Sequence, residues 1–267
     1  MIGNTVRSEW IRIWRGSFLL GGIGVTAGFA ALVSVFVYTA ATDVPSEPSA
    51  AGLGPGFAST ADIAQPGGFL TALATVSGLA GVVLLALWAI AAAGDYSTGL
   101  IRILVQAQPN RINLLSGKIL ALTLFTVLTT LTTTLAVVLV ARPLARLEGI
   151  ETDAWKTDFI THLLSSYFNF AVAGLVWGLI GLMIAVVTRS SALAIGVGIG
   201  WLLVVENLIG IIAPDSTVYL PGGTLNALVS GGTSQLAWIT ALGLTVLYGI
   251  VAIIISLVAF RSRDITS

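Results

Sequence analysis

Side chains that could do acid–base chemistry are sparse in the apolar runs of this sequence, and Glu206 is the exception. It is the only ionisable residue deep within such a run. An acidic group at that depth marks either function or a specific partner, because burying it in hydrocarbon is costly. It could be protonated and hydrogen-bonded to Asn169, at a similar predicted depth, as a structural brace. It could instead be ionised and line a wet cavity.

Four more side chains are candidates for a pathway through the membrane. Asn207 follows Glu206 directly, and three aromatic residues are predicted near mid-membrane instead of in the interfacial belts. These aromatic residues are Trp177, Trp201 and Tyr248. They could line a route for an amphiphilic substrate, or they could pack between helices.

Signatures of catalysis and metal binding are missing from the sequence. It contains no cysteine, a single histidine at position 162, and neither HExxH nor GxSxG. No GxxxxGK[ST] phosphate loop occurs, since the pair Gly117–Lys118 lacks the upstream glycine and the following hydroxyl. We therefore predict no enzyme, no catalytic residue, no metal and no cofactor bound by this chain. The formal net charge of zero argues against nucleic-acid binding.

The composition indicates an all-α polytopic membrane protein. The 267 residues are 56% hydrophobic and 9% charged, against about 25% charged in soluble domains. Apolar runs predict a single transmembrane domain over residues 1–267 with six spans, each long enough to cross the bilayer. The predicted spans are about 18–41, 69–93, 119–141, 163–187, 192–213 and 236–260, and residues 1–17 are predicted as an interfacial helix.

The distribution of basic residues predicts the orientation. With a cytoplasmic amino terminus, nine of the twelve Lys and Arg residues fall in inside segments and three outside. This bias predicts a multi-pass protein of the cell inner or plasma membrane, with both termini cytoplasmic.

A polar island over residues 93–118 interrupts the apolar runs on the predicted cytoplasmic side. Asp95, Ser97 or Thr98 can begin a short helix, and Pro109 ends it. An apolar stripe follows from the spacing of Leu100, Ile101, Leu104 and Val105. Taken alone, this amphipathic helix could simply lie against lipid. Two basic residues that precede the next span, Arg111 and Lys118, are expected at the level of the lipid headgroups.

The island resembles the loop between spans two and three in permease subunits of type-2 ATP-binding-cassette (ABC) transporters, in the variant of high-GC Gram-positive bacteria. The motif runs from Asp95 to Arg102 as DYSTGLIR, continues as Pro109-Asn110-Arg111 and ends at Lys118. The family more often has Glu where Asp95 stands. The resemblance also covers the six spans, the inside termini, the first interfacial helix and an apolar hairpin between spans five and six.

The resemblance implies that the island is a coupling helix, which docks on a separate ATPase (nucleotide-binding) subunit carrying ATP and Mg. A second permease copy or a sister permease would complete a dimer within the membrane lipids. The residues that it assigns to coupling are Asp95, Thr98, Gly99, Leu100, Ile101, Arg102, Leu104, Val105, Pro109 and Arg111.

The last predicted outer segment, residues 214–235, is only mildly polar and contains two Gly-Gly pairs. A short helix around residues 224–229 that dips into the outer leaflet fits this composition, provided that protein covers its flanking turns. An ordinary surface loop is the alternative.

Together these features predict the permease of an efflux transporter for an amphiphilic compound such as a drug, a peptide antibiotic or a lipid-like molecule. Two alternatives stay open. One is a cation exporter of the same family with Glu206 as the ion site. The other is a membrane signalling or scaffold subunit that transports nothing.

Overall fold

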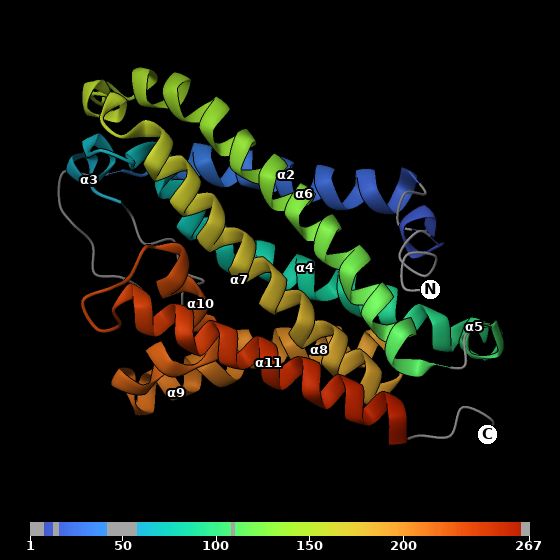
Figure 1. The fold of residues 1–267 in the computed structure, drawn as a ribbon. Helices are drawn as coiled ribbons and strands as arrows, with labels where there is room; N and C mark the ends of the chain where they lie inside the picture. Colours follow the sequence, from blue (N-terminus) through green and yellow to red (C-terminus); the bar gives the residue numbers. More distant parts are fainter. Residues whose placement is uncertain (1–7, 13–15, 42–57, 108–109, 263–267) are drawn as a thin grey trace.

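Helices dominate the computed structural model, which describes residues 8–12, 16–41, 58–107 and 110–262 (Figure 1). Within these ranges no β-strand is found, and six helical segments are long and apolar enough to cross a membrane. The chain is therefore a multi-pass membrane protein. The six segments are α2 (Gly16–Thr39), α4 (Thr71–Ser97), α6 (Arg111–Leu147), α7 (Phe159–Thr188), a composite of α8 and α9, and α11 (Trp238–Ser262).

The composite segment is not a uniform α-helix. It consists of α8 (Ser191–Gly200), a turn of π-helix called η3 (Trp201–Val205), and α9 (Glu206–Ile212). A single turn of π-helix is rare and is often found at a functional site. Glu206 begins the helix that follows this turn.

Helix α6 extends well beyond its predicted span of 119–141. Its 37 residues correspond to about 55 Å at 1.5 Å per residue, which exceeds the ~30 Å hydrocarbon core. The helix begins at Arg111 because the side chain of Asn110 accepts hydrogen bonds from the amides of Ile112 and Asn113. The second part of the polar island is therefore the first two turns of α6.

Two tryptophans and two glycines interlock the central helices α4 and α7. Trp88 of α4 lies against Gly178, where a Cβ atom would be 2.4 Å from the indole. Reciprocally, Trp177 of α7 lies against Gly81, where a Cβ would be 2.3 Å from the ring. Each glycine thus provides the space that a large side chain on the opposite helix fills, which is how small residues let membrane helices approach closely.

Buried threonines of α6 satisfy their hydroxyl groups within their own helix. Each donates to the carbonyl four residues earlier, and Thr126 also accepts a 2.9 Å hydrogen bond from Nε1 of Trp88. These contacts place the threonines in helix packing. The buried threonines are Thr126, Thr129, Thr130, Thr133 and Thr134.

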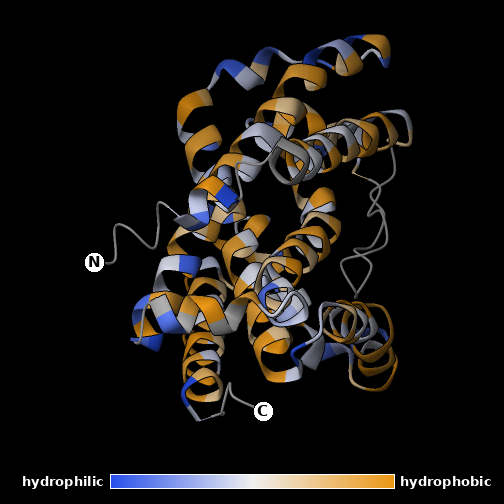
Figure 2. Cartoon of the chain, turned by 90° about the vertical axis from the view of Figure 1, so that its right-hand side faces the viewer, coloured by the Kyte–Doolittle hydropathy of each residue, from blue (hydrophilic) through white to orange (hydrophobic). Residues whose placement is uncertain are grey.

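The short elements gather at the two ends of the bundle (Figure 1). At one end, called the α5 end, lie residues 8–12, α5 (Leu100–Ala107) and the last turn of α11. The opposite end, called the α10 end, carries α3 (Thr60–Ala64), η1 (Gly68–Leu70), η2 (Asp153–Lys156), η4 (Pro214–Tyr219) and α10 (Pro221–Val229). Figure 2 shows that the long helices are mostly hydrophobic and that hydrophilic residues concentrate at helix ends and in short segments.

Aromatic residues close the α10 end, where the connection between α2 and α4 packs against the connection between α6 and α7. Nε1 of Trp155 donates a 2.8 Å hydrogen bond to the carbonyl of Ile63. The ring of Phe69 stacks on Phe159 with centroids 4.6 Å apart. Residues 58–70 of the first connection are consequently packed into the fold.

Candidate functional site

The turn that separates α4 from α5 is built by Thr98 and Gly99. The hydroxyl of Thr98 donates to the carbonyl of Gly94 at 2.7 Å, and its amide donates to the same carbonyl at 3.1 Å. Gly99 then adopts a φ of +68°, a left-handed conformation that favours glycine. Thr98 therefore ends α4, and the prediction that Asp95, Ser97 or Thr98 begins α5 was wrong.

The apolar side chain that α5 exposes is Ile103, which is not part of the predicted stripe. Leu104 is partly buried against the core of the chain, and Leu100 is also partly buried. Ile103 is 62% exposed. The sequence pattern does not single out Ile103, because apolar residues occupy five of the six positions from 100 to 105 and several helical faces therefore fit. The side chains of Ile101, Arg102 and Val105, and the whole of Pro109, lie outside the described residues.

Four charged residues form a network behind α5. Nζ of Lys118 lies 2.5 Å from Oδ2 of Asp95 and 3.4 Å from Oε2 of Glu9. Nη2 of Arg12 lies 2.5 Å from Oδ1 of Asp95, and its Nη1 lies 2.9 Å from Oε1 of Glu9. Lys118 also donates to the carbonyl of Ala91 at 3.0 Å. The network thus contains two carboxylates and two cations, whose charges sum to zero.

The burial of this network corrects two expectations. Asp95, Lys118 and Glu9 are only 1%, 6% and 4% exposed. Lys118 does not lie among lipid headgroups, and Asp95 is not part of an exposed docking surface. Burial lowers the pKa of Arg12, but its hydrogen bonds with Asp95 and Glu9 and their negative charges outweigh this effect and raise the pKa above its ordinary value. The guanidinium therefore stays charged.

Arg111 connects the beginning of α6 to the end of α11. Its Nη1 donates to the carbonyls of Phe260 at 3.3 Å and Arg261 at 3.4 Å. A cation at the carboxyl end of a helix satisfies free carbonyls and complements the helix dipole. This contact joins α6 to α11 at the α5 end.

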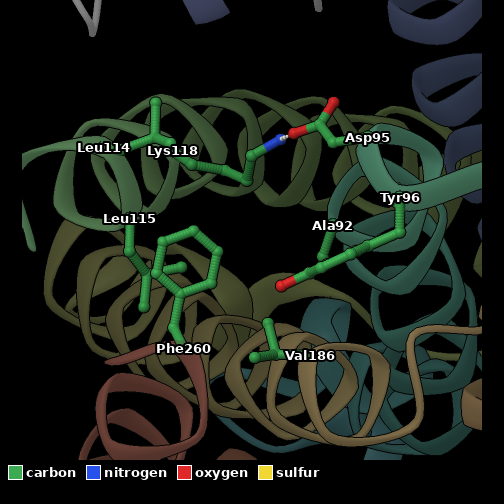
Figure 3. Close-up of a pocket in the computed structure, with 8 residues that line it drawn as sticks. All are labelled: Ala92, Asp95, Tyr96, Leu114, Leu115, Lys118, Val186 and Phe260. Carbon is green, nitrogen blue, oxygen red and sulfur yellow. Dashed lines mark hydrogen bonds and ion pairs between the residues drawn. The ribbon is translucent and has the colours of Figure 1, made fainter. Parts of the chain in front are cut away.

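A pocket lies directly behind these contacts, where α4, α6, α7 and α11 meet (Figure 3). The hydroxyl of Tyr96 points into it, and the Lys118–Asp95 pair lies at its edge. The guanidinium of Arg189 lies 5.9 Å from the centroid of the Tyr96 ring. The other lining residues are Ala92, Leu114, Leu115, Val186 and Phe260. Helix α5, which connects α4 to α6, therefore lies close to the point where four spans converge.

Glu206 makes contacts different from those expected. Its Oε1 accepts a 2.7 Å hydrogen bond from Nε1 of Trp201 and a 2.9 Å hydrogen bond from the amide of Gly222. Asn169 instead accepts a 3.0 Å hydrogen bond from Nε1 of Trp238. Glu206 is thus braced, but the expected pair with Asn169 is not formed among the described residues.

The other pathway candidates also have specific contacts. Asn207 donates to the carbonyls of Leu202 at 3.3 Å and Leu203 at 2.9 Å, within the π-helical turn. The hydroxyl of Tyr248 donates to the carbonyl of Tyr219 and so links α11 to η4. Trp177 is 4% exposed and occupies the space beside Gly81, whereas Trp201 is 39% exposed. These contacts place Asn207 and Trp201 at the π-helical turn, Trp177 between α4 and α7, and Tyr248 between α11 and η4.

The chemistry of these sites is that of ion pairing and helix capping. Across the described residues, no group of three or more His, Cys, Asp or Glu side chains could hold a metal ion. Both hydrogen bonds that Oε1 of Glu206 accepts come from N–H donors, so this oxygen is satisfied within the chain. These contacts fit a structural brace.

The chain was compared with known families and proteins. No protein-family model matches it. No curated protein matches it significantly. An assignment of function consequently depends on the sequence motif and on the contacts described above.

Proposed function

We propose that the chain is the permease subunit of an ABC exporter of type 2, which moves an amphiphilic compound across the cell membrane. A separate ATPase subunit binds ATP and Mg, and a second permease, identical or related, completes the assembly. Both termini and α5 face the cytoplasm. Export is the direction that the resemblance implies.

One observation carries the proposal. Helix α5 is a short separate helix between two spans, and it exposes 62% of Ile103 at the end of the bundle. Helix α5 follows α4 directly, and its Leu104 packs against the core. Next to it, Asp95 of α4 pairs with Lys118 of α6, and Arg111 of α6 donates to the end of α11. A force applied to α5 would reach α4 first and then α6 and α11 through these contacts, as coupling to an ATPase requires.

The composition supports an amphiphilic substrate. The spans are almost entirely apolar, and the side chain of Trp201 is 39% exposed.

Purification of the tagged chain from its native host tests the proposal. We expect an ATPase subunit to copurify and the complex to hydrolyse ATP faster when the exported amphiphile is added. Ile103→Asp is expected to abolish this stimulation at unchanged expression, because a charge disrupts an apolar contact. Leu147→Asp is the matched control, since Leu147 is 80% exposed at the α10 end. A chain that purifies without an ATPase, or stimulation that survives Ile103→Asp, would contradict the proposal.

A further inference from the structure

The composite span α8–α9 is the least buried of the six membrane segments found in the described residues. Only 17% of its most apolar window is buried, against 28% to 61% for the others. Ile211 and Ile212 of α9 are 79% and 82% exposed. Few contacts therefore fix α9, and the buried carboxylate of Glu206 is prominent among them.

The π-helical turn positions Glu206 for its contacts. On a regular α-helix, residues 201 and 206 would lie about 140° apart around the axis. The amide of Glu206 instead donates to the carbonyl of Trp201, five residues earlier, which brings the two side chains onto one face. Nε1 of Trp201 can then donate to Glu206 at 2.7 Å. Asn207 satisfies carbonyls within the turn and stabilises its irregular backbone.

The opposite partner of Glu206 is the first turn of α10. The amide of Gly222 donates to Oε1, and the amide of Gly223 also faces the carboxyl group. Amides in the first turn of a helix have no partner within the helix, and its dipole favours a negative group there. A Cβ at Gly222 would lie 2.3 Å from Oε2 of Glu206, so only glycine allows this approach.

A glycine pair lies in the first turn of α10 and another follows its end. Gly222 and Gly223 come after Pro221, which begins the helix, while Gly231 and Gly232 follow it with φ values of +77° and +104°. Glycine readily adopts such left-handed conformations, which other residues resist. Helix α10 is therefore followed by an adaptable connection.

From these contacts we infer that Glu206 is a latch between α9 and α10. Its carboxylate holds α9 against the first turn of α10, and the π-helical turn keeps the carboxylate in place. Release of the Glu206–Gly222 contact frees α9 to move away from α10, which stays packed on α11, α7 and α4, while the α5 end stays intact. This latch acts whether or not an ATPase drives the protein.

A single introduced cysteine tests the latch, because the chain contains none. Leu202→Cys places a thiol on the π-helical turn, beside Gly222 of α10, at a position that is 1% exposed, and Leu115→Cys places one at the α5 end at 3% exposed. Maleimide labelling rates of the purified protein report how often each site opens. Glu206→Ala is expected to raise the rate at position 202 by about tenfold or more, since buried hydrogen bonds are lost. The rate at position 115 is expected to stay the same.

Two further variants make the test specific. Glu206→Gln retains an acceptor oxygen and is expected to label more slowly than Glu206→Ala. Asp215→Ala removes an exposed acid from neighbouring η4 and is expected to change neither rate. The inference is overturned if Glu206→Ala leaves position 202 protected or raises both rates equally. It is also overturned if the Gln variant labels faster than the Ala variant.

Discussion

Nζ of Lys118 in α6 lies 2.5 Å from Oδ2 of Asp95 in α4, and both side chains are almost completely buried. The pair is completed by Arg12 and Glu9 from near the amino terminus. Removing one member of a buried pair leaves an uncompensated charge, which is more destabilising than loss of an exposed pair.

Lys118→Met is therefore expected to destabilise the protein by about 3–5 kcal/mol. Thermal and denaturant unfolding in detergent would measure the loss. Lys156→Met is the matched control, because Lys156 forms its 2.9 Å ion pair with Asp153 at the surface, and no measurable change is expected. Combining Lys118→Met with Asp95→Asn should cost less than the two single losses together, since the two residues are coupled. Strict additivity would contradict the coupling.

The close approach of α4 and α7 predicts that two glycine-to-alanine substitutions differ in their effect on stability. A Cβ at Gly181 would lie 2.3 Å from the backbone oxygen of Leu85, which cannot move aside like a side chain. Gly181→Ala should cost roughly 1–3 kcal/mol or more. At Gly24 of α2, a Cβ would meet no atom within 4 Å, so Gly24→Ala should leave the unfolding transition unchanged. Equal effects of the two substitutions would show that this helix contact is looser than described.

The contact of Arg111 predicts a local effect at the end of α11. Arg111→Gln removes the charge-assisted contact with the carbonyls of Phe260 and Arg261 and should weaken the last turn by about 0.5–1 kcal/mol. Hydrogen exchange of the amides in this turn would then accelerate while the rest of α11 stays protected. Arg146→Gln, at an exposed residue of the α10 end, is the control. Unchanged exchange in Arg111→Gln would refute the capping role.

Hydropathy predicted the six membrane segments well because each is a long apolar run. It could not place the ends of α6, since this helix continues outside the hydrocarbon and is begun by the side chain of Asn110. The sequence marked Asp95 and Lys118 as members of a motif. It could not reveal that Lys118 pairs with Glu9 and Asp95 with Arg12, because these partners lie far away in sequence and meet only in three dimensions.

The contacts of Glu206 are a second case that the sequence alone could not predict. Its depth in an apolar run indicated function or a specific partner, and Asn169 was the expected partner. The structure instead gives Trp201 and the backbone amide of Gly222, and the second of these is a contact that no pattern of side-chain types reveals. The π-helical turn also changes the register that a regular helix would give between residues 201 and 206.

Cross-linking from α5 tests the central proposal most directly. In the cysteine-free chain, Ile103→Cys places a thiol on the exposed face of α5, and Leu147→Cys places one at the opposite end. We expect a thiol-specific cross-linker to join Ile103→Cys, and not Leu147→Cys, to a subunit that a photoreactive ATP analogue also labels. If Ile103→Cys forms no such adduct in native membranes, or if both variants form it equally, then α5 is not the site where an ATPase docks.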